Sequence, residues 1–115
     1  VQEQVSPKQL TSVSVLSQER FYTISLANGA QYTLPALRVG ASTLVFITMG
    51  QSRTTYAILS ADTVGIIPIA KGDAVMINPT SDPGSGNLRI WRDGNSLVVK
   101  NASGGGRDIT VKMIG

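Results

Sequence analysis

Short runs of β-branched and aromatic residues, separated by turn signals, are the feature that most constrains the fold of this chain. The turn signals are rich in Gly, Asn, Asp and Pro and recur about every 8 to 12 residues, as in sandwiches and barrels. No stretch favours a helix by its periodicity. The sequence therefore predicts about eight to nine strands, near residues 20–26, 31–34, 43–49, 54–59, 64–69, 74–77, 88–92, 95–100 and 107–115.

This pattern predicts an all-β fold, an antiparallel, jelly-roll-like β-sandwich. The 115-residue chain is long enough to bury one core, so residues 20–115 are expected to form a single domain. Residues 1–19 are expected to form an N-terminal arm or edge strand, because Ser12 to Val15 alternates like a strand. A short helix capped at Ser6-Pro7 is the alternative for this segment.

Two of the expected strands carry further information. The run Thr43–Met49 is nearly continuously apolar, which predicts a strand at the centre of the fold with both faces covered. The run Val64–Ile69 contains Gly65 and Pro68, which suit a bulge or an edge strand.

The sequence lacks most of the residue types that enzymes commonly use for catalysis. The chain has no His and no Cys, so it lacks the commonest general base, a thiolate nucleophile and the best ligands for zinc. Its seven carboxylates are scattered, and the Gly-rich segment 103–106 precedes a strand, whereas phosphate-binding loops open a helix. We therefore expect no enzyme, no cofactor and no metal site; a glycosidase pair of carboxylates is the remaining alternative.

The net charge of +3 comes from ten basic residues that are spread along the chain. A protein that follows a phosphate backbone needs such residues gathered into a stripe, so no nucleic-acid partner is expected. No run of about 18 apolar residues occurs either, and no membrane insertion is expected.

Trp91, the single tryptophan, is the first candidate for a contact with a partner or a glycan. If Asp93-Gly94 forms a two-residue turn, Arg92 faces Asn95 and Trp91 faces Ser96. Leu88, Ile90, Leu97 and Val99 then share a core face, whereas Arg89, Trp91, Val98 and Lys100 lie on the other. Trp91 beside Arg89 would be an interface anchor or a sugar-stacking platform. A three-residue turn would instead make Trp91 a core residue.

Several strand-and-turn segments resemble bacteriophage virion modules. They run from Ile24-Ser25-Leu26-Ala27-Asn28-Gly29-Ala30-Gln31-Tyr32-Thr33-Leu34-Pro35 through the strands around Leu44–Ile47, Tyr56–Ile58, Leu88–Trp91 and Ser96–Asn101 to Ile109–Gly115. Their pattern of strands and turns is similar to that of the β-sandwich modules of phage tail knobs, tail fibres and head-decoration proteins. No functional residue of that family can be assigned to this chain, because the likeness lies in the pattern of strands and turns and not in a site motif.

The resemblance implies a phage virion structural protein. It implies a homotrimeric jelly roll at the tail tip or on the capsid surface, in contact with other virion proteins and, for a tail knob, a host-surface glycan or receptor. A capsid decoration protein is one alternative, and a monomeric carbohydrate-binding module that uses Trp91 is the other. The short N-terminal region leaves no room for a long shaft and favours a knob or decoration protein over a fibre.

Overall fold

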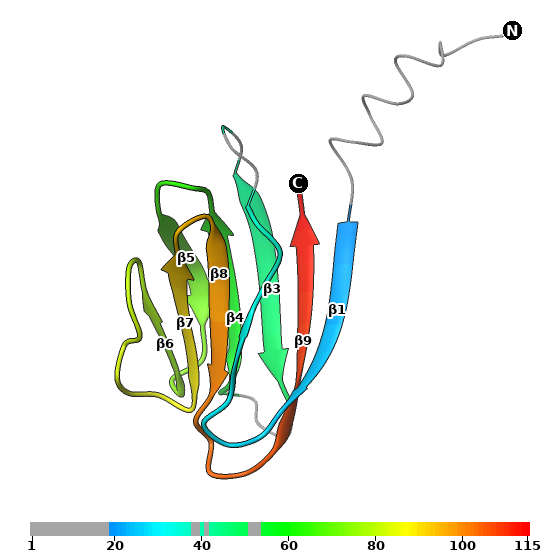
Figure 1. Ribbon diagram of the computed structural model, residues 1–115, viewed down its shortest axis with the longest axis vertical. Helices are drawn as coiled ribbons and strands as arrows, with labels where there is room; N and C mark the ends of the chain where they lie inside the picture. Colours follow the sequence, from blue (N-terminus) through cyan, green and yellow to red (C-terminus); the bar gives the residue numbers. More distant parts are fainter. Residues whose placement is uncertain (1–18, 38–39, 41, 51–53) are drawn as a thin grey trace, which may run out of the picture.

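The structure is a computed structural model that describes residues 19–37, 40, 42–50 and 54–115. The described residues form no helix; nine strands make two sheets, which confirms the all-β sandwich (Figure 1). The predicted arm falls mostly outside these residues, and the first strand begins at Glu19. The strands are β1 (Glu19–Leu26), β2 (Gln31–Thr33), β3 (Thr43–Met49), β4 (Tyr56–Ala61), β5 (Ile66–Lys71), β6 (Val75–Asn78), β7 (Leu88–Asp93), β8 (Ser96–Asn101) and β9 (Arg107–Ile114).

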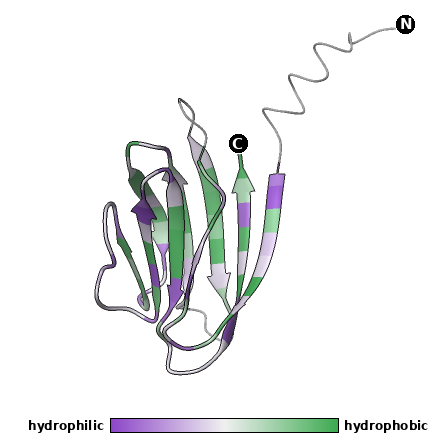
Figure 2. Cartoon of the chain, in the orientation of Figure 1, coloured by the Kyte–Doolittle hydropathy of each residue, from purple (hydrophilic) through white to green (hydrophobic). Residues whose placement is uncertain are grey.

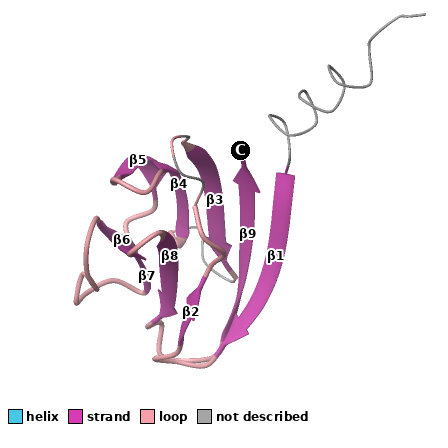
Figure 3. Ribbon diagram, turned by 45° about the horizontal axis from the view of Figure 1, so that its top comes forward, coloured by secondary structure: helices cyan, strands magenta, loops and turns pink. Residues whose placement is uncertain are grey.

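The strands near the two ends of the chain pair with each other, one pair in each of the two sheets. Sheet A has five strands in the order β1-β9-β3-β4-β5, and sheet B has four in the order β2-β8-β7-β6. The first strand, β1, pairs with the last, β9, in sheet A, and β2 pairs with β8 in sheet B (Figure 3). This wrapping is the feature shared with a jelly roll, whereas β3, β4 and β5 form a simple antiparallel meander.

The core lies between the two sheets and follows the period-2 alternation of the strands. Alternate residues of β3, β4 and β9 face it, as the burial pattern of β9 shows most regularly. Leu34 and Leu37, which follow β2, close one side. The core members with no exposed surface at all are Val45, Ile47, Leu59, Val75, Leu88, Ile90, Leu97, Val99, Ile109, Val111 and Met113.

The two strands singled out in the sequence lie where predicted within sheet A. β3 is its central strand, but the prediction that both faces are covered is wrong for the single chain, because Leu44 and Phe46 on the outer face stay partly exposed. β5 is an edge strand with a register shift opposite Ile58/Leu59, next to Pro68. A proline at an edge removes no ladder hydrogen bond that a neighbouring strand needs.

Two turns differ in detail from the expectation. Gly29 has the expected positive φ of 83°, but the strands before and after it enter different sheets and do not pair with each other. Between β7 and β8, Asp93 pairs with Ser96, so Gly94 (φ 60°) and Asn95 form the turn and the predicted register is wrong by two residues. A two-residue slip keeps every side chain on its predicted face, because the side-chain period of a strand is two.

One strand pair is parallel, in contrast to the six antiparallel pairs among the described strands. β6 and β7 run side by side in the same direction, and residues 79–87 connect them. A parallel pair needs a connection that returns along the sheet before the second strand starts. This connection therefore crosses the surface of sheet B.

Candidate functional site

Trp91 lies on the outer face of sheet B, as predicted, yet the chain itself buries it. Its neighbours in the sheet are Val98 on β8 and Asn78 on β6. Trp91 is 7% exposed and Val98 is 0% exposed, and neither belongs to the contiguous core between the sheets. They form a small second apolar cluster on the far side of sheet B, which is a common arrangement beneath long loops.

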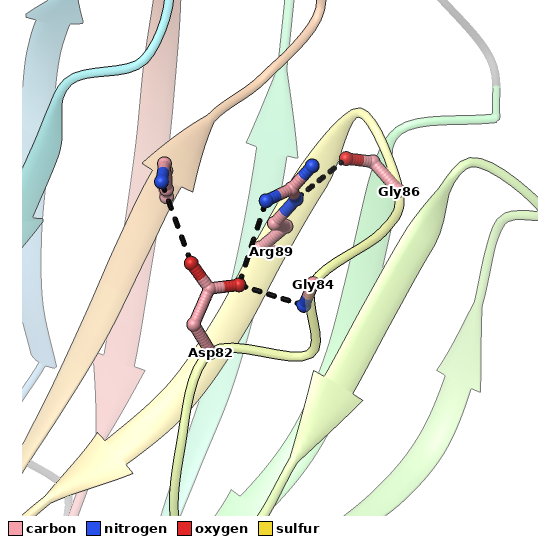
Figure 4. Close-up of polar contacts among 5 residues, drawn as sticks. Asp82, Gly84, Gly86 and Arg89 are labelled. Carbon is pink, nitrogen blue, oxygen red and sulfur yellow. Dashed lines mark hydrogen bonds and ion pairs between the residues drawn. The ribbon is translucent and has the colours of Figure 1, made fainter.

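The loop 79–87 lies on this outer face and is held there by Asp82. The Asp82 carboxylate contacts Lys100 Nζ at 3.4 Å and Arg89 Nη1 at 3.6 Å, and these two basic residues are paired across β7 and β8 (Figure 4). Arg89 Nε also donates to the carbonyl oxygen of Gly86 at 3.1 Å. The loop leaves the sheet after Asn78, beside Trp91, and we attribute the burial of the indole to its passage across β7.

Local backbone contacts shape the same loop. The Asp82 carboxylate accepts a hydrogen bond from the Gly84 backbone N–H at 2.9 Å, which closes an Asx turn. This bond, followed by the hydrogen bond from Lys100, lowers the pKa of Asp82 below its ordinary value. Gly86 has a φ of 95°, and a Cβ there would come within 2.7 Å of Met76 Cγ, so the loop fits closely against β6.

These contacts give Arg89 and Trp91 intramolecular partners. The guanidinium of Arg89 holds the loop, and the indole of Trp91 is buried, so the single chain presents no open aromatic platform at this position. Stacking on a sugar requires an accessible ring face. The role of Arg89 and Trp91 in binding a partner or glycan stays a prediction, which now requires the indole to become exposed.

The outer face of sheet A is a second candidate surface, and it is unusually apolar for a solvent-facing sheet. Directly opposed residues share a face, and the partners of half-buried Phe46 are Ile58 and Lys112. Phe21 pairs with Lys112 from the other side and is 65% exposed. Antiparallel sheets usually alternate between an apolar core face and a polar outer face, so this surface departs from the usual pattern.

An open concavity of about 400 Å³ lies where β1 and β9 meet, lined by residues 25–27, 50 and 106–108. Ser25 Oγ donates to Asp108 Oδ1 at 2.6 Å within it. With no His in the chain, this pair cannot complete a Ser-His-Asp triad.

Among the described residues, no three Asp or Glu side chains gather where they could hold a metal ion. The described residues also include no helix long and apolar enough to span a membrane.

Asn101 is a buried polar residue that the sequence analysis did not identify. Its Nδ2 donates to the carbonyl oxygens of Leu26 and Gly105, both at 2.8 Å. Its Oδ1 accepts from the backbone N–H and the hydroxyl of Ser103. The side chain thus ties the end of β1 to the crossover from sheet B to sheet A. An Asn before a Ser-Gly-rich turn is too common a pattern to have indicated this role.

Comparison with known proteins adds no relative: the chain matches no family model, no curated protein and no solved structure.

Proposed function

We propose that this protein is a non-enzymatic structural module of a bacteriophage virion that works as a closed homotrimer. We place it at the tail tip, as a knob module for tail assembly or host adsorption. The phage assignment rests on the resemblance of the strand-and-turn segments described above. The β-sandwich fold is compatible with it, and the surfaces of the sandwich support an assembly role.

The observation that carries the assembly role is the two-sided apolar character of β3. Val45 and Ile47 face the core and are fully buried, whereas Leu44 and Phe46 face outward and are covered by nothing from sheet B. Figure 2 shows most of β3 in the colour of hydrophobic residues. A central strand with apolar residues on both faces is typical of a sheet that is covered on both sides. The second cover is missing in one chain, which favours an oligomer.

A carbohydrate-binding module is the function most directly opposed to this proposal. It would use Trp91 as a platform, and the 7% exposure of that residue argues against it. A capsid decoration protein would have the same assembly and differ only in its place on the particle. Electron microscopy of phage particles labelled with antibodies against the full chain distinguishes tail from capsid, and absence of label on both would refute the virion assignment.

The assembly state is tested by sedimentation velocity of the full chain at micromolar concentration. We expect one species with about three times the 12.1 kDa mass of the chain. A monomer across the concentration series would contradict the proposed function, because a closed oligomer of this type is held by permanent interfaces.

A further inference from the structure

We propose that the outer face of sheet A is the subunit interface, where it packs against further copies of the same chain. This inference rests on the proposed function, since it names the surface through which the oligomer forms. An oligomer could form through any face of the sandwich, and the residues of sheet A indicate which face, with which side chains and within which limits.

Two neighbouring rows of side chains make the apolar part of this face. Cross-strand pairing gives one row of Phe21, Lys112, Phe46, Ile58 and Ala70. The second row, one step along the strands, runs Glu19, Ile114, Leu44, Ser60 and Ile67. The rows reach both edges of the sheet, where Phe21 is 65% and Ile67 is 69% exposed. Each of the five strands thus contributes at least one apolar side chain to the two rows, and Lys112, Glu19 and Ser60 are their polar members.

A polar row bounds the apolar rows on one side. Thr23, Thr110, Thr48 and Tyr56 are successive cross-strand neighbours on the same face. Their hydroxyl groups can hydrogen-bond to water or to a neighbouring subunit without a charge to desolvate. An apolar centre beside a polar rim is the usual anatomy of a protein–protein interface.

The charges of this face favour a second copy over a charged partner. Lys112 Nζ lies 3.6 Å from Glu19 Oε2, so the positive charge in the apolar row has a partner on the same face. Copies of this face can therefore lie next to one another around a symmetry axis with little net repulsion. The basic pair Arg89 and Lys100 lies on the outer face of sheet B, on the other side of the sandwich. A nucleic acid would need its cations on the contact face.

The size of the face also fits an interface between subunits. Five strands spaced by about 4.8 Å, with two side-chain rows about 7 Å apart, make an apolar area of roughly 300 Å² in plan. That is at the lower end of the largest apolar patches on monomers, which often have a function. A standard interface buries about 800 Å² on each partner, and the threonine row and exposed Ile69 and Val64 near β5 extend the surface toward that size.

The test is the double substitution Phe21→Thr/Ile67→Thr. Both side chains are mostly exposed in the single chain, so their loss should leave the fold intact, and threonine retains a high strand propensity. The matched control is Tyr32→Thr on β2 of sheet B, an aromatic residue that is 41% exposed. We expect the double variant to weaken self-association at least 100-fold in sedimentation velocity, with an unchanged far-ultraviolet circular dichroism spectrum, and the control to associate like the wild type.

Each outcome separates the two proposals. An oligomeric wild type with an equally oligomeric double variant would overturn this surface and leave the proposed assembly in place. A monomeric wild type would overturn the assembly and this inference with it. If the double variant fails to fold, Lys112→Glu replaces it. Both positions are solvent-exposed, so this variant should fold. It sets two carboxylates side by side on the face and should also weaken association, because like charges would be brought together at the interface. Unchanged association of a folded Lys112→Glu would count against the surface.

Discussion

Removal of the Trp91 side chain tests whether this buried residue stabilises the folded subunit. Trp91 is 7% exposed and lies outside the main core, on the far side of sheet B. Truncation of a buried Trp to Ala typically costs about 3 to 5 kcal/mol of stability. Because Trp91 lies outside the main core and keeps a small exposed fraction, we expect Trp91→Ala to cost about 3 kcal/mol, at the lower end of this range.

The expected loss is large enough to measure by thermal or urea unfolding. For a chain of 115 residues, each kcal/mol lowers the melting temperature by about 3 to 6 °C, so a fall of roughly 10 to 20 °C is expected. Far-ultraviolet circular dichroism is the suitable probe, because the variant has lost its only Trp. Tyr32→Ala is the matched control, and its 41% exposure predicts a much smaller loss.

A second measurement uses the wild-type indole as a reporter. Because Trp91 is the only Trp, its fluorescence should be shifted toward the blue and poorly quenched by acrylamide in the folded chain. The reasoning would be refuted if Trp91→Ala lost less than about 1 kcal/mol of subunit stability while self-association weakened. That result is expected of an interface anchor, whose truncation costs about 2 kcal/mol or more of binding.

Three further outcomes are expected. Gly72→Ala should destabilise the fold by about 1 to 3 kcal/mol in urea unfolding, because a Cβ there would overlap the backbone of Thr54; an unchanged midpoint would contradict this. Asn101→Ala should cost about 1 to 3 kcal/mol and speed hydrogen exchange near the crossover, because buried carbonyl oxygens lose their donor; unaltered exchange there would argue against the role. Acid should destabilise the protein below about pH 4. The pKa values of Asp62 and Asp82 are lowered by backbone N–H donors, first from Gly65 and Gly84, so the unfolded chain binds protons first as the pH falls. Stability measured from pH 6 to pH 2 should fall less in a variant with both residues changed to Asn.

The sequence by itself determined the local elements of this protein. The predicted strands correspond to the nine strands of the structure, and Gly65 with Pro68 correctly indicated an edge strand for β5. The face on which Trp91 lies was also correct despite the wrong register, because alternation fixes faces and a two-residue slip does not change them. These are properties of neighbouring residues along the chain, which is why the pattern alone reveals them.

Only the tertiary structure decided which strands share a sheet and what covers each face. The sequence around Gly29 does not show that β1 pairs with β9 at the other end of the chain, since that pairing depends on residues more than 80 positions apart. Nor does it show that Asp82 reaches Arg89 and Lys100 and thereby holds the loop 79–87 on the outer face of sheet B. Burial is set by whatever packs on a face from elsewhere in the chain. A local pattern therefore places a side chain on a face, and long-range packing decides whether that face meets water.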